Sequence, residues 1–310
     1  RSTNGGASWT NVGTLAATGC ANANIQSWYN AGLLVHPTDP NIVFARAVDQ
    51  FRSTDGGANF TNVTCGYGGG NVHVDQHAAT FVAGNPDRLL IGNDGGVYYS
   101  ENPYNTAGRP SFLTLNQQLP TIEFYTGDIT ANFANAQNAG AVGGAQDNGT
   151  SVSTWSNGQP QTQPWNARLG GDGMYARIEP VLGQRWYMSS QNGNIRASTT
   201  GPNGAVNTTV NPSWGSDRKS FITPFEIYKH GGESTGCPAA TGCQRMIAGT
   251  FRVWESVQGG IPSSSWYIRP AMPPSANGTA APGPAVRAAT PLPPAVSRAV
   301  ASSRRAFMLS

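Results

Sequence analysis

Charged residues are scarce in this chain, and their scarcity excludes one class of partner. Asp, Glu, Lys and Arg make up 11% of its 310 residues, against about 25% in an ordinary globular protein. No run of Lys or Arg precedes the last segment, which begins near residue 269 and contains arginines but no acidic residue. A nucleic-acid-binding surface needs clustered basic side chains. We therefore predict no nucleic-acid partner.

Long apolar segments are also missing. No stretch approaches the ~18 consecutive apolar residues of a membrane span, so no span is predicted. The chain has no start methionine and no signal peptide, and Arg1 lies inside a repeat, which indicates a processed or truncated protein. No cofactor is predicted, because no Gly-rich phosphate loop precedes a helix.

The cysteines lack the spacing of a metal site. They are Cys20, Cys65, Cys237 and Cys243, and none belongs to a C-x-x-C motif. Cys237 and Cys243 flank a short loop that a disulfide could close, which leaves Cys20 and Cys65 as the remaining pair. Free buried thiols are the alternative. Since disulfides persist in oxidising compartments, we predict a secreted or periplasmic protein.

Glycine, proline and aromatic residues are abundant. The 39 Gly and 22 Pro residues predict frequent turns and few helices. The 8 Trp and 10 Tyr residues supply enough apolar area for a core. The low charge therefore does not indicate disorder.

One segment occurs twice near the start of the chain. The opening RSTNGGASWTNV recurs as RSTDGGANFTNV from Arg52 to Val63, which indicates an internal repeat. Both copies fit S-x-[D/N]-x-G-x-x-[W/F], with Ser2, Asn4, Gly6 and Trp9 in the first and Ser53, Asp55, Gly57 and Phe60 in the second. A degenerate third copy lies between Ser256 and Trp266. These segments resemble the Asp-box, or BNR repeat, of secreted bacterial β-propellers.

The chemistry of this segment is that of a turn. A short Asp or Asn side chain accepts hydrogen bonds from backbone N–H groups two residues on, the glycines permit positive φ, and the aromatic ring packs inward. The resemblance implies that the segment joins the third and fourth strands of a blade. We expect the Asp boxes to stabilise the fold and to take no part in catalysis.

Between the boxes the chain alternates short strand patterns with Pro/Asn/Asp turns and tight Gly hairpins, which predicts an all-β fold. A repeat of ~40 to 50 residues favours a β-propeller over a sandwich or barrel. Five units are predicted, at 29–64, 72–118, 122–167, 173–215 and 219–268. The resemblance implies four-stranded blades with Asp-box turns, and a larger parent ring. We predict a propeller over 1–268 and a flexible Pro/Ala/Arg-rich tail over 269–310.

Polar residues gather in the hairpins, and in one loop entering a first strand (GGDGM), that the resemblance places on one face of the propeller. The strings GNDGG, AQDNG, SQNGN and GGDGM contribute Asn93, Asp94, Gln146, Asp147, Asn148, Gln191, Asn192 and Asp172. We predict Asp94, Asp147 and Asp172 as candidate catalytic carboxylates and the amide side chains as ligand-binding groups. The alternative is that each residue only forms its turn, because Asp-Gly and Asn-Gly steps are common in tight hairpins.

The string HVDQH adds a second candidate group. If it is a strand, His73, Asp75 and His77 point to one side. Such a set could contact substrate, or hold a divalent metal with open positions. The alternative is a hydrogen-bonded cluster that closes a loop.

The resemblance covers residues 1–268 and extends to xyloglucanases, sialidases and, more distantly, sortilin-type receptors. It implies a polysaccharide or other glycan as partner, and a glycoside hydrolase with two carboxylates. The arginine segment F/Y-R-I-P of sialidases is absent, and the nearest string is RIEP at Arg177. The competing hypothesis is a non-catalytic propeller that binds a glycan or a peptide. Its aromatic platforms would be Trp155, Trp165, Trp186 and Trp214.

Overall fold

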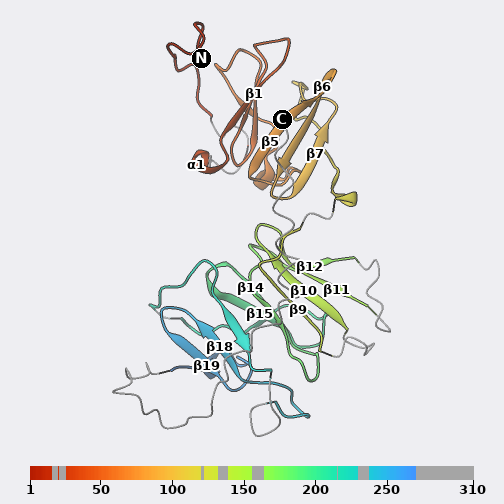
Figure 1. Cartoon of the computed structure of the whole chain (residues 1–310), viewed down its shortest axis with the longest axis vertical. Coiled ribbons are helices and arrows are strands. Elements are labelled where there is room, and N and C mark those ends of the chain that lie inside the picture. Colours follow the sequence, from red (N-terminus) through yellow and green to blue (C-terminus); the bar gives the residue numbers. More distant parts are fainter. Residues whose placement is uncertain are drawn as a thin grey trace, which may run out of the picture. The chain divides into compact units, whose positions relative to one another are not determined.

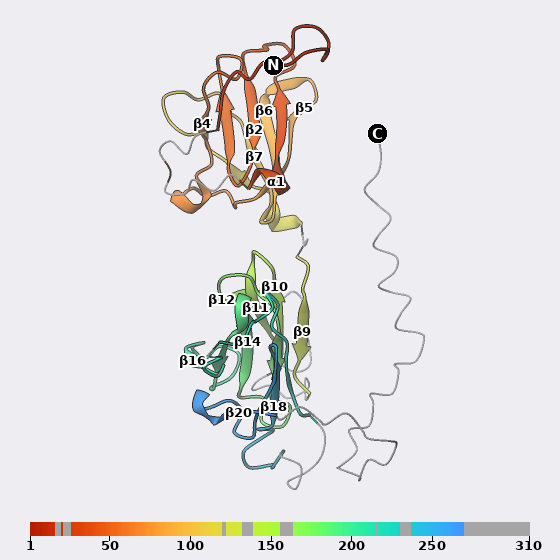
Figure 2. The same ribbon diagram turned by 90° about the vertical axis from the view of Figure 1, so that its left-hand side faces the viewer.

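The described part of the chain holds five four-stranded antiparallel sheets (Figures 1 and 2). The first holds β1 (Gly32–Val35), β2 (Val43–Arg46), β3 (Gln50–Ser53) and β4 (Thr61–Asn62). The second holds β5 (Gln76–Val82), β6 (Asn85–Asn93), β7 (Gly96–Ser100) and β8 (Leu113–Thr114). The third holds β9 (Thr126–Ile129), β10 (Gly140–Ala145), β11 (Gly149–Thr154) and β12 (Asn166–Leu169). The fourth holds β13 (Ala176–Ile178), β14 (Trp186–Ser190), β15 (Asn194–Ser198) and β16 (Thr208–Thr209), and the fifth holds β17 (Phe225–Ile227), β18 (Met246–Gly249), β19 (Val253–Ser256) and β20 (Trp266–Ile268).

In every sheet each strand pairs with the next one along the chain, so each sheet is a meander and has the topology of a propeller blade. Each of the five predicted units matches one sheet, although β12 (Asn166–Leu169) runs beyond the end of the third unit. The predicted fold class, an all-β propeller of four-stranded blades, is therefore confirmed. We refer to the sheets as blades 1 to 5 in chain order.

This computed structural model describes residues 1–15, 20, 26–119, 122–131, 139–155, 164–214, 216–229 and 237–269. The predicted tail, 269–310, lies outside the described residues except for Arg269, whose N–H donates to the Val253 carbonyl oxygen at 2.9 Å. One α-helix, α1 (Ser27–Asn30), and short 3-10 turns complete the secondary structure of the described part; these turns are Gly66–Gly68, Asn116–Gln118, Gln191–Gly193 and Ser263–Ser265. Within that part, no helix has the length and apolar character needed to cross a membrane.

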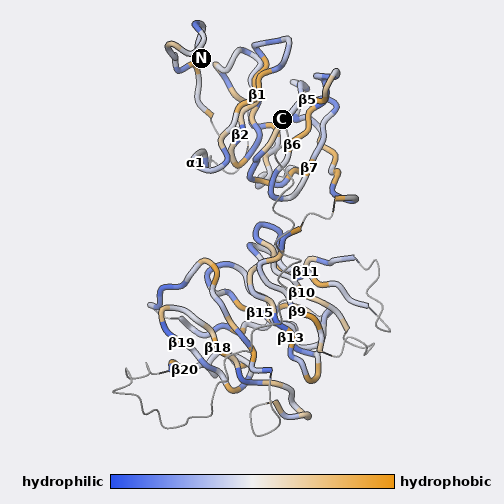
Figure 3. Tube along the Cα trace, in the orientation of Figure 1, coloured by the Kyte–Doolittle hydropathy of each residue, from blue (hydrophilic) through white to orange (hydrophobic). Residues whose placement is uncertain are grey.

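The core consists of apolar side chains held between consecutive blades. Phe44 of β2 packs with Leu89 and Ile91 of β6 between blades 1 and 2. Trp186 of β14, which is completely buried, packs with Val142 of β10 between blades 3 and 4, and a third cluster joins blades 4 and 5. Among the described residues, no such cluster joins blades 2 and 3. Apolar and polar residues alternate in short stretches along the strands in Figure 3.

The second copy of the repeated segment, Arg52 to Val63, forms the turn between β3 and β4, where the resemblance had placed it. The Ser53 hydroxyl donates to Asp55 Oδ1 (2.7 Å) and accepts from the backbone N–H of Gly57 (2.9 Å). Asp55 accepts from the N–H of Asn59 (2.9 Å), four residues on instead of the predicted two. Gly57 has φ 94°, and a Cβ on it would lie 3.8 Å from the Phe60 ring. Phe60 packs inward against the blade 1 core, as predicted.

The first copy repeats the hydrogen bonds but not the packing. Ser2 and Asn4 bond to each other at 2.9 Å, and the N–H of Gly6 donates to Ser2 Oγ at 2.8 Å. The Trp9 ring, however, is 75% exposed. The prediction that the aromatic packs inward is wrong here, because no described strand flanks this turn to supply a core.

Two further turns share part of this bonding. In the degenerate third copy, Ser256 Oγ accepts from the N–H groups of Gln258 (3.1 Å) and Gly260 (3.0 Å). In a turn after β7, which the sequence pattern missed, the Ser100 hydroxyl donates to Asn102 Oδ1 at 3.2 Å, as Ser53 does to Asp55. The serine that ends the third strand is therefore present in each of these turns, whereas the residue at the Asp position varies.

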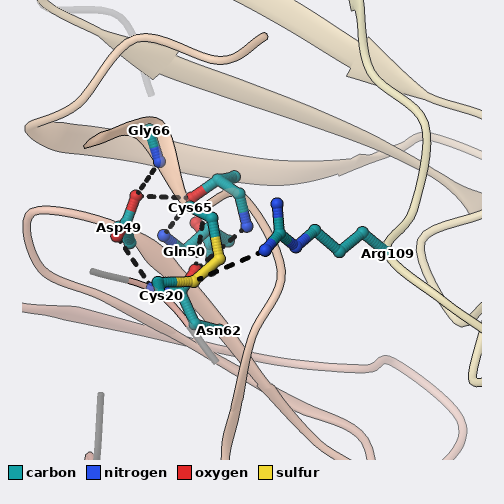
Figure 4. The surroundings of a disulfide bond; sticks show 8 residues. Cys20, Asp49, Gln50, Asn62, Cys65, Gly66 and Arg109 are labelled. Carbon is teal, nitrogen blue, oxygen red and sulfur yellow. Dashed lines mark hydrogen bonds between the residues drawn. A yellow bond between two sulfur atoms is a disulfide. The ribbon is translucent and has the colours of Figure 1, made fainter. Parts of the chain in front are cut away.

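Two disulfides join the pairs expected from the sequence, Cys20 with Cys65 and Cys237 with Cys243. Cys65 follows β4, and the buried Asp49 carboxylate holds the loop after it by accepting from the N–H of Gly66 at 2.7 Å (Figure 4). The Arg109 guanidinium points toward the Cys20 sulfur in the same view. The first disulfide therefore ties a segment before blade 1 to the loop that leads into blade 2.

Candidate functional site

Three carboxylates from separate loops meet at one place. Asp75 lies in the loop that leads into β5, Asp94 in the hairpin between β6 and β7, and Asp147 in the hairpin between β10 and β11. One oxygen of each lies within 4.8 Å of the other two. We call Asp75, Asp94 and Asp147 the acidic cluster. The structure thus brings together two of the three predicted catalytic carboxylates, together with a third from the HVDQH string.

Tight turns position these side chains. Asp147 has φ 60° and Asp75 has φ 63°, both in the left-handed region. Non-glycine residues rarely adopt this conformation, although Asp and Asn tolerate it best, and it concentrates at functional sites. The third predicted hairpin shows the same feature at Asn192, with φ 59°.

Asp172, the remaining predicted carboxylate, supports the cluster from blade 4. Its Oδ1 accepts from the backbone N–H of Asp147 at 3.1 Å, and its own N–H donates to Gln191 Oε1 at 3.1 Å. On the other side, Asn148 Nδ2 donates to the Asp94 carbonyl oxygen at 2.9 Å. The polar residues predicted on one face of the propeller, from blades 2, 3 and 4, therefore form one hydrogen-bonded series.

Two carboxyl groups of the acidic cluster have raised pKa values. Burial, a hydrogen bond with Asp172 and the charge of Asp94 raise the pKa of Asp147 to about 7. Burial and then the charge of Asp94 also raise the pKa of Asp75. A carboxylic acid that keeps its proton near neutral pH can serve as a general acid.

The histidines of the HVDQH string do not lie as the strand pattern predicted. The strand β5 begins only at Gln76, and the positive φ of Asp75 turns the chain just before it. His73 therefore faces the Asp147 carbonyl oxygen (Nε2, 3.0 Å), whereas His77 bonds to Asp94 Oδ1 (Nε2, 2.6 Å). The two rings contact different members of the cluster, so the predicted metal set of His73, Asp75 and His77 does not converge. The acidic cluster itself offers oxygen donors of the kind that hard divalent cations take.

Three predicted amide residues hold neighbouring groups in place. Asn93 Nδ2 donates to the His73 carbonyl oxygen at 3.0 Å, and Asn93 Oδ1 accepts from the N–H of Gly95 at 3.0 Å. Gln146 Oε1 accepts from the Tyr125 hydroxyl at 2.5 Å. The backbone N–H of Asn192 donates to the Phe221 carbonyl oxygen at 2.9 Å. These bonds shape the hairpins, and of these three residues only Gln146 also lines the cleft described next.

The acidic cluster lines an open cleft of about 640 Å³. Aromatic side chains from two segments form its apolar walls: Trp28 and Tyr29 of α1, and Phe124 and Tyr125 before β9. Trp28 is 84% exposed. The Tyr29 ring meets His77 edge-on at 5.4 Å. The cleft coincides with the junction of blades 2 and 3, where the described residues have no apolar cluster.

The aromatic platforms proposed from the sequence are different residues. Trp155, Trp186 and Trp214 are buried in the core and cannot contact a ligand. Trp165 is 46% exposed and packs on Phe124 at 5.0 Å, so it supports the cleft wall.

Sequence reasoning also missed Asn30, whose Nδ2 donates to Asp75 Oδ1 at 2.9 Å from a buried position. Neither the SWYN string of α1 nor the segment before β9 carries a pattern that would have singled out the missed residues.

No family model matches this chain, and no curated protein matches it. Among solved structures, an ancestral GH74 enzyme aligns with 80% of this chain and 32% of its own at 13% identity and a TM-score of 0.32. Sqt1 of Chaetomium thermophilum aligns over 80% and 60% of the two chains (14% identity, TM-score 0.35). The GH74 enzyme of Niastella koreensis aligns over 76% and 37% (14% identity, TM-score 0.27). The present chain thus spans less than two thirds of each.

Likeness at this level says nothing about activity. The class of protein follows from the chain itself: an all-β protein of propeller blades with a carboxylate-lined cleft between two of them.

Proposed function

We propose that this chain hydrolyses glycosidic bonds in a polysaccharide, with Asp94 and Asp147 as the paired carboxylates. One observation carries the proposal: oxygens of these two side chains lie within 4.8 Å of each other at an open cleft. Glycosidases place two carboxyl groups on either side of the scissile bond, about 5 to 5.5 Å apart in retaining enzymes and about 6.5 to 9.5 Å apart in inverting ones. A separation below 4.8 Å is nearer to the retaining range than to the inverting one, so we propose the retaining mechanism.

Asp147 is the general acid in this proposal, because burial and its carboxylate neighbours raise its pKa to about 7. Asp94 attacks the anomeric carbon while Asp147 gives its proton to the departing glycosidic oxygen, which forms a glycosyl ester on Asp94. Asp147 then takes a proton from water, and the hydroxide attacks the anomeric carbon and releases Asp94. Acid, base and nucleophile are thus all carboxylates of the cluster.

The surrounding residues position this pair. His77 bonds to Asp94 at 2.6 Å and orients its carboxylate. Asp172 accepts from the backbone of Asp147 and fixes the strained hairpin. The rings of Trp28 and Tyr125 offer flat apolar faces on which the C–H faces of sugar rings can stack.

A non-catalytic role in binding a glycan or a peptide is the second candidate. The observation that favours it is the aromatic lining, with four aromatic residues in one cleft. A binding module needs this aromatic lining but does not need the raised pKa of the Asp147 carboxyl group.

We also infer that the protein is secreted or periplasmic and belongs with the Asp-box propellers. The two disulfides support the first inference, because such bonds are rare in reducing compartments. The serine and aspartate hydrogen bonds of the turn after β3 support the second.

The experiment is a reducing-sugar assay over a panel of polysaccharides, with Asp94→Asn and Asp147→Asn as test variants. Each should lower turnover at least a hundredfold, which is the size of a lost general acid or nucleophile, and leave binding intact. Asp87→Asn, at an exposed carboxylate of β6, is the matched control and should keep full activity. Turnover that persists in both test variants would refute the mechanism. Binding by the wild type with no turnover on any substrate would favour the binding module.

The same assay with a chelator tests the oxygen donors of the cluster. Turnover that is unchanged by EDTA is expected for a mechanism run by carboxylates alone. A loss that calcium restores would assign the cluster to a cation and would remove Asp147 as the acid.

A further inference from the structure

Blade 5 carries a group of basic and aromatic side chains that the proposed hydrolysis does not use. The hairpin between β18 and β19 places Phe251 at its tip, 74% exposed. The Arg218 guanidinium stacks over this ring at 5.3 Å from its centroid. The N–H of Phe251 donates to the Arg218 carbonyl oxygen at 3.1 Å, so the backbone contact holds the stacked pair together. Lys219 is exposed beside it. We call Arg218, Lys219 and Phe251 the basic tip.

The charge of the basic tip is not neutralised locally. Asp217 is the neighbouring carboxylate, and it is already bound by Arg252 at 2.5 Å, by the Thr250 hydroxyl and by the Trp254 indole. These bonds hold the pKa of Asp217 at about 2. Within the described part of the chain, no carboxylate forms an ion pair with Arg218 or Lys219. Two positive charges therefore face solvent.

Hydrogen bonds connect the basic tip to the acidic cluster through successive hairpins and inter-blade loops. From Asp147 the series passes to Asp172 and on to Gln191. The next residue, Asn192, donates to the carbonyl of Phe221, in the loop that also contains Arg218 and Lys219. Asp147, Gln191 and Phe251 lie in hairpins between the second and third strands of their blades. Asp172 and Phe221 lie in loops that lead into a first strand. A propeller presents both kinds of loop on one face. A polymer that occupies the cleft can therefore extend along this series to blade 5.

We propose that the polysaccharide is anionic and that the basic tip binds its acidic groups. This inference rests on the proposed function for the identity of the ligand as a glycan. A guanidinium binds carboxylate or sulfate groups through two parallel hydrogen bonds, and Lys219 adds a point charge. The uncovered part of the Phe251 ring supplies a flat face for a sugar. The acidic groups of the polymer would lie over blade 5, away from the carboxylates of the cleft that would repel them.

The test is affinity gel electrophoresis of the full chain in gels that contain polygalacturonate, dextran sulfate or neutral dextran. Arg218→Gln/Lys219→Gln is the test variant. Arg88→Gln/Arg245→Gln removes the same net charge from the starts of β6 and β18, at the ends of those strands opposite to their hairpins, and is the matched control. The wild type and the control should be retarded by at least one polyanion. The test variant should bind it at least tenfold more weakly, and 500 mM NaCl should abolish the difference.

The two polyanions separate the sources of the acidic group: retardation by polygalacturonate alone assigns a uronate, and by dextran sulfate alone a sulfate ester. Equal retardation by neutral dextran, or equal binding by the test variant and the wild type, would overturn the inference. Equal binding of double-stranded DNA would overturn it too. Asp147→Asn should bind the polyanion as the wild type does, so a loss of hydrolysis with retained binding contradicts neither proposal. Binding that depends on the basic tip, in a protein without any hydrolase activity, would refute the proposed function and leave this inference standing.

Discussion

Replacing Asp147 by Asn should make the protein more stable at pH 8, although it removes the proposed catalytic acid. The pKa of this carboxyl group rises from an ordinary 3.8 to about 7 in the folded chain. The folded state therefore holds a proton between pH 4 and pH 7 that the unfolded state has already lost. The wild type consequently loses stability as the pH rises through this window, and the loss is complete above pH 7.

The magnitude follows from the size of this difference. At about 1.4 kcal/mol per pKa unit, the rise from 3.8 to about 7 corresponds to about 4 kcal/mol. Asp147 is only partly buried and water screens its neighbours, so we expect about 2 kcal/mol. Asn tolerates the positive φ of this position as well as Asp does, and it keeps the backbone bonds to Asp172 and His73. The substitution should therefore remove the cost of burying this charge and its repulsion by Asp94, without new strain.

The assay is thermal unfolding of the wild type and Asp147→Asn at pH 4, 6 and 8. At pH 8 the variant should melt about 4 to 8 °C higher, because about 2 kcal/mol shifts a chain of this size by that amount. At pH 4 the two should melt together, since both side chains are then neutral. Asp87→Asn should match the wild type throughout. An equal gain at pH 4 and pH 8 would show that the effect is not protonation, and no gain at pH 8 would refute the clustered-carboxylate description.

Three other predictions concern stability. Asp55→Ala should lower the melting temperature by a few degrees, because Asp55 accepts hydrogen bonds from Asn59 and Ser53. These bonds lower the pKa of Asp55 to about 2. They therefore stabilise the fold above pH 4 and lose their effect as the pH falls toward 2. Asn4→Ala should change the melting temperature little, because Trp9 of its turn is exposed whereas Phe60 of the Asp55 turn packs on the core. A larger loss from Asn4→Ala than from Asp55→Ala would contradict this reasoning. Removing the Cys20–Cys65 disulfide, whose loop spans 45 residues, should lower the free energy of unfolding by about 4 kcal/mol on the chain-entropy account. The Cys237–Cys243 disulfide, with a sequence separation of 6, should contribute about 2 kcal/mol. Calorimetry of the two double Ser variants tests this order, and a reversed order would disprove it. Ending the chain after Ala271 should leave the melting temperature within a few degrees, because the sequence beyond it lacks periodic apolar residues; insoluble protein would show that the tail is part of the fold.

Local sequence determined the blades. Strand and turn signals depend on neighbouring residues, since alternation of apolar side chains and Gly-containing hairpins act within a few positions. The five predicted units therefore each match one sheet. The turn around Asp55 and the two cysteine pairs follow from equally short spacings or from simple pairing.

Tertiary structure decided which polar residues meet. Asp94 and Asp147 lie far apart in sequence, and only the docking of blade 2 beside blade 3 brings them within 4.8 Å. The strand pattern misplaced His73 and His77 because a single positive φ at Asp75 breaks the alternation. Burial separated the tryptophans in the same way: Trp186 fills the core, whereas Trp28, in a segment without any motif, lines the cleft. A side chain's partners across blades depend on packing between segments that are distant in sequence. Local sequence patterns do not predict that packing.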